Sequence, residues 1–394
     1  MIPMRLRDIT IETILGDSIM SRAIRHVAGK SVHGGFDGMY PGNLIEYWNE
    51  HGVQIKNLIR TYCYYPKPVE RFYIPKPGGK KGREIGLHTA LDQAILTAIN
   101  MVLLPLYDEK FSDSSYAFRP GRNCEAAIFH SMAIMHKGYD FVIKTDIHKC
   151  FDTIDHKILL QILRREIKDE CLICLIERFL KIDIYWNQRI TTKSIGVVQG
   201  SSLSPLLANI YLNELDKELE RKRIPFIRYA DDILIFERSI RLANSAYIEA
   251  KGILKRKLNM TFSSEKTEKC CRTQVTFLGY KIKRVRNRYV LYVSDKAERK
   301  LEDAMNSLWR KPEEKRIEWM GSFNRGWINY YQYADDAQLY RLSSFADGRQ
   351  RAQIGRLLKH LNRQERDFIL GYSYHYVPMT QWRKTVNARR KNRK

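Results

Sequence analysis

Two adjacent aspartates, Asp231 and Asp232, stand between two short runs rich in strand-forming residues, 224–229 and 233–236. These runs predict two β-strands with the aspartates in the tight turn at the tip of a hairpin. Neighbouring carboxylates repel each other, so a folded protein tolerates such a pair mainly when a divalent cation neutralises it. Mg²⁺ suits this position because it prefers hard oxygen ligands. The pair therefore predicts a phosphoryl-transfer site.

The same four residue types occur a second time, as Tyr333-Ala334-Asp335-Asp336. Here the apolar residues on both sides have helical spacing. We therefore interpret Asp335 and Asp336 as solvated acids in the first turn of a helix, and the repeat as coincidence.

A third acid, Asp146, ends the apolar run of residues 141–147, which is typical of a buried strand. If this strand lies beside the hairpin, three carboxylates from two segments meet. Two Mg²⁺ ions roughly 3.5–4 Å apart could then activate a 3′-hydroxyl and stabilise the leaving pyrophosphate. The carbonyl of Ile147 is a further candidate ligand.

The elements that must position these acids can be predicted from apolar spacing and capping residues. Asp155 fits a helix N-cap better than a catalytic acid, and Ser204 with Pro205 fits the start of another helix. Residues 72–85 predict a basic β-hairpin with a glycine-built turn. Helices are expected in residues 1–65 with a glycine-rich interruption at 34–38, and in residues 91–106, 204–219, 296–309, 315–333 and 350–361.

The chain has 394 residues, of which 44% are hydrophobic, enough for two or three domains with buried cores. Its 68 Lys and Arg residues against 44 Asp and Glu residues give a formal net charge of +24. A surplus of this size is typical of a protein that follows a polyphosphate, so nucleic acid is the expected partner. A ribosomal or merely basic protein is the alternative, and the acidic pair in a strand hairpin argues against it.

Neither a signal peptide nor a membrane span is expected. The longest apolar stretch, residues 94–107, contains Asn100 and Pro105 and is shorter than the roughly 20 residues that cross a bilayer. The seven cysteines are odd in number, which favours reduced thiols in a cytoplasm over a disulfide framework. Cys171 and Cys174 have the spacing of zinc ligands, but they continue a helical pattern up to residue 180, which favours small buried side chains.

Seven segments, read in order, resemble the successive motifs of bacterial group II intron reverse transcriptases, and an eighth is similar to the maturase, or thumb, segment of that family. The resemblance covers nearly the whole chain, and the order and spacing of the segments make it specific. The segments are residues 73–81, 115–122, 146–152, 199–213, 229–232, 264–267 and 277–280, with 325–331 as the eighth.

The resemblance implies an α+β right-hand polymerase with fingers, a palm built on an antiparallel sheet with packed helices, and an α-helical thumb. The implied domains are residues 1–292 for fingers and palm, 293–382 for the thumb or maturase domain, and 383–394 for a basic tail that we expect to be disordered without a partner. Such an enzyme copies an RNA template into DNA from a DNA or RNA primer with dNTPs. It uses two Mg²⁺ ions, for which Mn²⁺ can substitute, and its thumb binds intron RNA to assist splicing.

The family's functional residues can be carried over by position. Asp146 and Asp231 match the metal ligands, with Asp232 as the third catalytic acid. The positions that match nucleotide-binding residues are Lys76, Lys80, Arg83, Phe151, Gln199, Gly200 and Lys266. The positions that match nucleic-acid-binding segments are Arg119, Arg122, Arg325, Trp327, Tyr330 and Tyr331.

Several of these assignments have a simpler alternative, which for Lys76, Lys80 and Arg83 is a merely solvated turn. Phe151 also fits a core side chain, Gln199 an ordinary turn before a helix, and Lys266 a surface lysine after a cap-like serine pair. The sequence also departs from the family pattern. The departures are Val198 before the Gln-Gly pair, Ser201-Ser202 after it, and Asp92-Gln93 where the family has an arginine.

No pattern of a carboxy-terminal endonuclease is found, and a bacterial cytoplasmic location is expected. Two rival functions remain. One is a domesticated reverse transcriptase of the same type that acts in DNA repair, phage defence or CRISPR spacer acquisition. The other is an RNA-binding splicing factor without polymerase activity, against which the intact Asp146, Asp231 and Asp232 argue.

Overall fold

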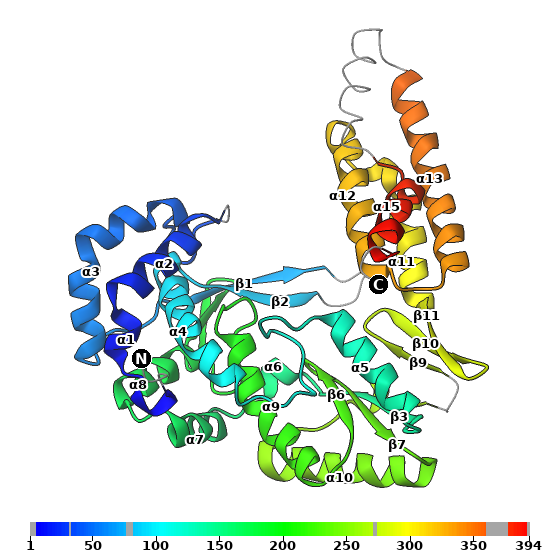
Figure 1. Cartoon of the computed structure of the whole chain (residues 1–394). Helices are drawn as coiled ribbons and strands as arrows, with labels where there is room; N and C mark the ends of the chain where they lie inside the picture. The colour runs from blue at the N-terminus through cyan, green and yellow to red at the C-terminus, as the bar shows by residue number, and fades with distance from the viewer. Residues whose placement is uncertain (1–4, 31–32, 76–81, 271–273, 360–376, 392–394) are drawn as a thin grey trace. The chain divides into compact units, whose positions relative to one another are not determined.

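The structure is a computed structural model that describes residues 5–30, 33–75, 82–270, 274–359 and 377–391 (Figure 1). The chain forms two compact units. Unit 1 contains residues 1–134 and 141–269, and unit 2 contains residues 135–140 and 270–394. The expected α+β class is confirmed by a mixture of helices and sheets. We expected a domain boundary at residues 292–293. The boundary between the units instead lies at residues 269–270, because the strands of residues 274–293 belong to unit 2.

Unit 1 begins with three helices that the sequence predicts, α1 (Ile11–Leu15), α2 (Asp17–Ala28) and α3 (Leu44–Arg60). Helix α2 packs against α4 (Ala90–Asp108), whose N-terminus is capped by the Thr89 side chain. The predicted helix of residues 91–106 is confirmed by α4, which continues through Pro105 to Asp108. Burial of residues such as Ile95, Ile99 and Leu103 in the core compensates for the hydrogen bond that proline cannot donate.

Helix α4 is long and apolar enough to cross a membrane by length and composition alone. However, 61% of its most apolar 18-residue stretch is buried inside the protein. This burial is what a core helix of a globular unit shows.

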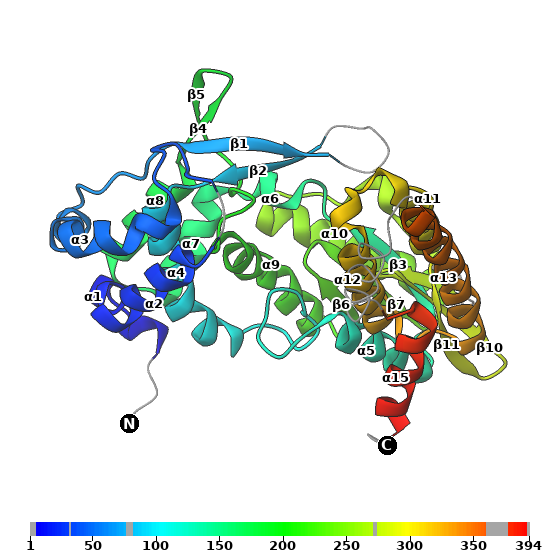
Figure 2. The same cartoon turned by 90° about the horizontal axis from the view of Figure 1, so that it is seen from above.

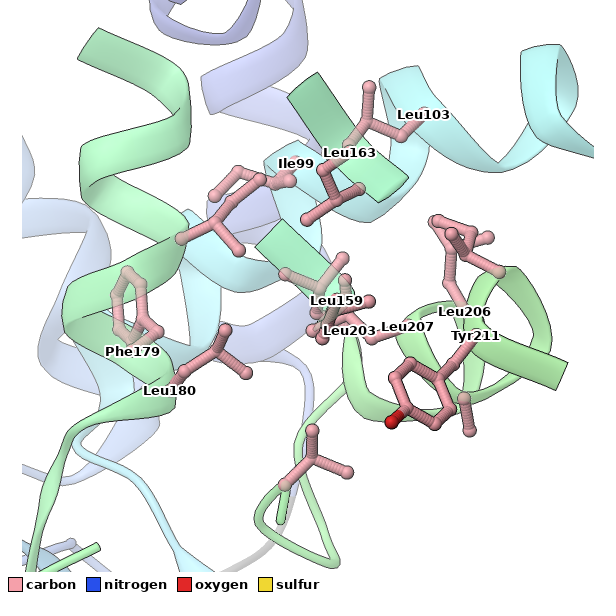
Figure 3. Packing of buried hydrophobic residues seen from close by; sticks show 14 of the residues in the cluster. Ile99, Leu103, Leu159, Leu163, Phe179, Leu180, Leu203, Leu206, Leu207 and Tyr211 are labelled. Atoms are coloured by element: carbon pink, nitrogen blue, oxygen red, sulfur yellow. The ribbon is translucent and has the colours of Figure 1, made fainter. Parts of the chain in front are cut away.

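The core of unit 1 lies where α4 meets α7 (His156–Glu166), α8 (Glu170–Leu180) and α9 (Ser204–Arg221) (Figure 3). Asp155 caps α7, as predicted, because its carboxylate accepts hydrogen bonds from the amides of Lys157 and Ile158. Cys171 and Cys174 lie on α8 as free thiols. Ser204 does not cap α9 as expected. Leu203 is the N-cap, and the Ser204 hydroxyl instead donates to the carbonyl of Val198.

A four-stranded sheet in unit 1 has the order β6-β7-β3-β8, with β6 (Phe226–Tyr229), β7 (Asp232–Glu237), β3 (Phe141–Asp146) and β8 (Glu268–Cys270). The middle strands β7 and β3 are mostly buried, in agreement with their continuous apolar sequences. Helix α10 (Ile240–Leu258) packs against both of them and against α9. This packing fixes the end of the sheet at which β3 ends with Asp146 and β7 begins with Asp232.

A second sheet of unit 1 has the order β2-β1-β4-β5. The predicted basic hairpin forms β1 (Val69–Ile74) and β2 (Arg83–Leu87), and a further hairpin forms β4 (Asp183–Trp186) and β5 (Arg189–Thr192) (Figure 2). Strand β4 runs parallel to β1, with Val69 opposite Ile184. This pairing ties the basic hairpin to the chain segment just before Gln199. Two further helices are α5 (Cys124–His136), whose last two residues belong to unit 2, and the short α6 (Cys150–Thr153).

Unit 2 contains the sheet β11-β10-β9, formed by β9 (Gln274–Phe277), β10 (Tyr280–Val285) and β11 (Arg288–Val293). The helices that follow are α11 (Asp295–Asn306), α12 (Glu313–Tyr331), α13 (Asp336–Lys359) and α15 (Met379–Lys391). The described part of the expected basic tail is helical in α15, and its disorder without a partner stays a prediction. The buried Asp347 caps this helix by accepting hydrogen bonds from the Met379 and Thr380 amides at 2.6 and 3.1 Å.

Candidate active site

The strands predicted to carry the three acids are neighbours. β3 and β7 run antiparallel, and their register places Asp146 opposite Asp232. The Ile147 amide donates a hydrogen bond of 3.0 Å to the main-chain carbonyl of Asp231. The chain after Asp146 is therefore tied to the hairpin tip, and all three acids lie at one edge of the sheet.

The hairpin tip between β6 and β7 is a two-residue turn. Tyr229 pairs with Asp232, which leaves Ala230 and Asp231 as the turn residues. Ala230 has a φ of +57°, a left-handed conformation that glycine adopts more readily and that costs a residue with a side chain about 1 kcal/mol. A turn that keeps alanine here must be held by contacts elsewhere in the fold.

Lys266 reaches the first of the acids. Its ammonium donates hydrogen bonds of 2.8 and 2.9 Å to the two carboxylate oxygens of Asp146. The contact is positioned by the main chain, because the Ser263 amide donates 2.7 Å to the Asp146 carbonyl just before the short 3-10 helix Ser264–Lys266. Partial burial lowers the pKa of Lys266, but the hydrogen bond and the charge of Asp146 raise it above its ordinary value.

The electrostatics of this edge favour a bound cation. Burial raises the pKa of the Asp232 carboxyl to about 6; Lys144 opposes this rise, and the charges of Asp231 and Asp146 add to it. Within the described ranges, no three His, Cys, Asp or Glu side chains are already arranged as a metal-binding group. The chemistry of the donors nevertheless fits Mg²⁺, because crowded carboxylates are hard oxygen ligands whose repulsion a divalent ion would relieve.

Phe151 lies on α6, shortly after Asp146 in the sequence. Its side chain is half-buried and packs against the core of unit 1, so the interpretation as a core residue describes part of its surroundings. The Phe151 carbonyl accepts a hydrogen bond of 2.7 Å from the Val197 amide. At Gly196, which has a φ of +80°, a β-carbon would lie 2.7 Å from the carbonyl oxygens of Phe151 and Asp152. Only glycine allows this approach, which joins the α6 turn to the loop that carries Gln199.

Each main-chain carbonyl in the loop of residues 196–199 accepts a hydrogen bond. The donors are His156 Nε2 to Gly196 at 2.7 Å, Lys193 Nζ to Val197 at 3.2 Å, Ser204 Oγ to Val198 at 2.6 Å and the Gly86 amide to Gln199 at 2.7 Å. Gly200 follows with a φ of +112°. Gln199 and Gly200 are thus fixed against β2 of the basic hairpin.

Lys193 was not expected from the sequence. Burial lowers the pKa of this lysine, which lies in a small cavity below the Gln199 loop. The cavity is lined by Arg71, Glu84, Gly86, Asp152, Ile184, Lys193, Val198 and Gln199. No local pattern distinguishes Lys193 from a surface lysine, because its role depends on the loop that folds over it.

The predicted basic hairpin is described only in part. Arg83 begins β2 opposite Ile74, whereas Lys76 and Lys80 lie outside the described residues. Their nucleotide contacts stay predictions.

Arg119 and Arg122 differ in surroundings. The Arg119 side chain is only 2% exposed and bonds to Asp108 and to the carbonyls of Ser112 and Ser115. This position does not support the expected contact with nucleic acid, because its donors face the interior. Arg122 is partly exposed and pairs with Asp113 at 2.6 Å.

The remaining predicted residues belong to α12 of unit 2. Arg325 is exposed, and Trp327 packs on Tyr331 with ring centroids 4.8 Å apart. The Tyr330 hydroxyl donates 2.6 Å to the carbonyl of Leu278, and burial raises the pKa of Tyr331 to about 12. The two tyrosines therefore join α12 to the β9–β10 turn, and Arg325 and Tyr330 are the exposed members of the group.

The second tetrapeptide has the helical role that its flanks predict. Asp335 Oδ1 accepts a hydrogen bond of 3.0 Å from the Gln338 amide, and Asp336 begins α13. Both acids lie in the helical part of unit 2 and take no part in the β3–β7 sheet.

Comparison with known proteins agrees with this geometry. Residues 74–282 match the family model of reverse transcriptases, described as RNA-dependent DNA polymerases. This range includes all three acids, Lys266 and the Gln199 loop, and it covers more than half of the chain.

Curated relatives indicate the branch of the family. The chain is 39% identical over 178 residues to the group II intron-encoded protein LtrA of Lactococcus lactis subsp. cremoris, an alignment that covers 44% of this chain and 30% of LtrA. It is 28% identical over 265 residues to Protein YkfC of Escherichia coli, covering 57% of this chain and 69% of YkfC. Nuclear intron maturase 1 of Arabidopsis thaliana is 25% identical over 201 residues, 38% of this chain and 28% of that protein.

The chain thus spans less than a third of the length of LtrA. The expected resemblance is confirmed by these matches. The protein belongs to the reverse transcriptase family and is similar to its group II intron-encoded members.

Proposed function

We propose that this protein is an RNA-directed DNA polymerase of the group II intron type. The observation that carries the proposal is the register of β3 and β7, which sets Asp146 opposite Asp232 and ties Asp231 to Ile147. In the family to which the chain belongs, this arrangement corresponds to the site of nucleotide addition. Unit 1 would then contain the fingers and palm, and the helices of unit 2 would form the thumb.

Asp146, Asp231 and Asp232 would hold the Mg²⁺ ions, two in number by analogy with the family, with the Ile147 carbonyl as an additional oxygen. When bound, such ions activate the primer 3′-hydroxyl and stabilise the charge on the leaving pyrophosphate. The raised pKa of Asp232 supports this role, because the fold keeps this carboxyl largely buried and close to the charges of Asp231 and Asp146.

Other residues of the chain would bind and orient the nucleotide. Lys266, already directed at Asp146, carries a proton that could pass to pyrophosphate as it leaves. Phe151 would lie under the incoming sugar and select against a 2′-hydroxyl. The Gln199-Gly200 loop, held at each carbonyl, would support the base pair between the incoming nucleotide and the template.

A role in intron splicing is the second part of the proposal. LtrA is named for its group II intron, and the Arabidopsis relative is named an intron maturase. Unit 2 presents basic and aromatic side chains, including the exposed Arg310 over the exposed ring of Trp309 and the exposed Lys311 over the half-buried ring of Trp319. Such pairs suit RNA, whose phosphates attract cations and whose bases stack on rings.

Primer extension tests the polymerase proposal. The purified chain should extend oligo(dT) on poly(rA) with dTTP, only when Mg²⁺ or Mn²⁺ is supplied, and EDTA should stop the reaction. Extension on poly(dA) in place of poly(rA) measures the preference for an RNA template. Incorporation of UTP in place of dTTP measures the preference for a deoxyribose sugar. A protein that binds the RNA duplex tightly but adds no nucleotide would support the rival splicing factor and contradict the polymerase.

A further inference from the structure

Arg228 is the largest side chain that is fully buried in the described part of the protein. It lies on β6, directly before Tyr229 and the acidic turn. Neither the proposed metal site nor the proposed nucleotide site uses it. A buried arginine that retains its charge requires partners for its donors, so the identity of these partners shows what the residue does.

One side of the guanidinium pairs with helix α9. Nε donates 2.8 and 3.0 Å to the two oxygens of Asp216, and Nη2 donates to the same carboxylate. Both side chains are 0% exposed. The bidentate pair fixes the plane of the guanidinium relative to the helix.

The other side of the guanidinium faces the acidic turn. Nη1 donates 3.0 Å to Asn209 Oδ1 and 3.1 Å to the main-chain carbonyl of Ala230. Asn209 and Asp216 are seven residues apart, two helical turns, so they present both acceptors from one face of α9. Asn209 is itself held by its amide, which donates 2.8 Å to the carbonyl of Ala117.

The Ala230 carbonyl belongs to the peptide that leads into Asp231. In a two-residue turn with φ of +57° at its first position, the orientation of this middle peptide sets the direction of the following side chain. The carbonyl on the far side of Asp231 is fixed by the Ile147 amide. The peptides before and after Asp231 are thus each held by one hydrogen bond, from Arg228 and from β3.

The main chain of Arg228 adds a third connection. Its amide donates a hydrogen bond of 2.8 Å to the Ser114 carbonyl, and its carbonyl accepts one of 3.0 Å from the Tyr116 amide. Position 228 therefore cannot shift along the sheet without breaking contacts on both its backbone and its side chain.

We infer that Arg228 is a positioning residue that transmits the rigid placement of α9 to the Ala230–Asp231 peptide and so presets the Asp231 carboxylate for a divalent cation. The inference rests on the proposed function and deepens it. It assigns to the Arg228–Asp216–Asn209 network a role in metal affinity in addition to its contribution to folding.

The test is Mn²⁺ binding to the full-length protein, measured by electron paramagnetic resonance without nucleic acid. Arg228→Lys keeps a charge that can pair with Asp216, but a single ammonium cannot also hold the Ala230 carbonyl. The dissociation constant for Mn²⁺ should rise about tenfold, the effect of one charge-assisted hydrogen bond. In primer extension, the Mg²⁺ concentration for half-maximal rate should rise similarly while the KM for dTTP stays unchanged.

Arg119→Lys is the matched control, because Arg119 is also buried and paired with an aspartate of the same unit but does not contact Ala230. Melting temperatures should fall for both variants, whereas only Arg228→Lys should weaken Mn²⁺ binding. Asn209→Ala, which leaves the charge pair intact, should weaken binding about threefold and serves if Arg228→Lys does not fold.

Equal Mn²⁺ affinities for Arg228→Lys, Asn209→Ala and the unmodified protein would overturn the inference and leave the polymerase proposal in place. If Asp231→Asn itself leaves Mn²⁺ binding unchanged, the metal site is misplaced, and both this inference and the metal site in the proposed function are wrong.

Discussion

Asp146 and Asp232 are directly opposed residues of two antiparallel strands, so the main chain that carries each carboxylate is held by the hydrogen bonds between β3 and β7. This pairing places acids from distant parts of the chain at one sheet edge before any ion binds. Activity should therefore depend more on the chemistry of the acids and their neighbours than on movement of the backbone at this edge.

Lys266 should be required for the rate of nucleotide addition. Its ammonium lies 2.8 Å from Asp146, and loss of a positioned proton donor lowers rates by roughly 100-fold or more. We expect Lys266→Met to reduce single-turnover primer extension by about 100-fold. Lys266→Arg, which keeps the charge, should lose much less. A Lys266→Met enzyme with full activity would assign this lysine to a purely structural ion pair.

Phe151 should control the choice of sugar. Replacing it with valine should admit ribonucleotides, because the ring that would collide with a 2′-hydroxyl is removed. Exclusion of this group corresponds to about 2–4 kcal/mol, or roughly 30- to 1,000-fold in selectivity. The measurement is the ratio of kcat/KM for dTTP and UTP. Phe179→Val, a core substitution on α8, should reduce stability without changing the ratio. Unchanged discrimination in Phe151→Val would show that Phe151 has only a packing role.

His88 should make unit 1 sensitive to acid. It is 5% exposed, and neither ring nitrogen has a hydrogen-bond partner among the described residues. Burial lowers the pKa of His88 from 6.5 to about 4, so the folded protein binds fewer protons than the unfolded chain between these values. The contribution of His88 to the free energy of unfolding is therefore fully present above pH 6.5. It declines below that pH and is lost as the pH falls through 4.

This loss amounts to about 3 kcal/mol for the one residue. Urea unfolding at a series of pH values measures it. His88→Met should flatten the decline in the free energy of unfolding between pH 6.5 and 4, whereas His51→Gln, at a partly exposed histidine, should leave it unchanged. Parallel curves for the unmodified protein and His88→Met would contradict the prediction.

RNA binding should weaken steeply with salt. The chain carries a net charge of +24, and each phosphate contact releases counterions, which gives a slope of about 0.7 per contact on single strands and about 0.9 on duplex DNA. Fluorescence anisotropy of a labelled RNA over a range of KCl concentrations measures the slope. A dissociation constant that does not change with salt would contradict a phosphate-based interface.

The sequence predicts those parts of the fold that local patterns determine. The strand up to Asp146, the hairpin around Asp231 and the cap at Asp155 depend on short apolar runs and one capping side chain, and the structure contains all three. The helix that runs through Pro105 and the helical part of the basic tail both depend on contacts with the rest of the fold. Burial of α4 in the core and capping of α15 by Asp347 are tertiary effects that outweigh local propensity.

The parts of the site that could not be predicted are those built from distant partners. The family resemblance matches Arg119 to a nucleic-acid-binding segment, but its side chain is buried against Asp108 and two carbonyls, which no local pattern reveals. Arg228 and Lys193 carry no local signal, because their roles depend on α9 and on the Gln199 loop. The three acids were identified because their residue type and their position at strand ends are both visible in the sequence.

The most direct test of the account replaces the two turn acids by their uncharged isosteres. Asp231→Asn/Asp232→Asn removes the metal-binding charges without altering the packing, and Asp335→Asn/Asp336→Asn is the matched control at the second tetrapeptide, where asparagine preserves the helix cap. Primer extension on poly(rA) with oligo(dT), dTTP and Mg²⁺ should vanish in the first variant and persist in the second. Both variants should retain the RNA affinity of the unmodified protein. Extension at the unmodified rate by Asp231→Asn/Asp232→Asn would contradict the account.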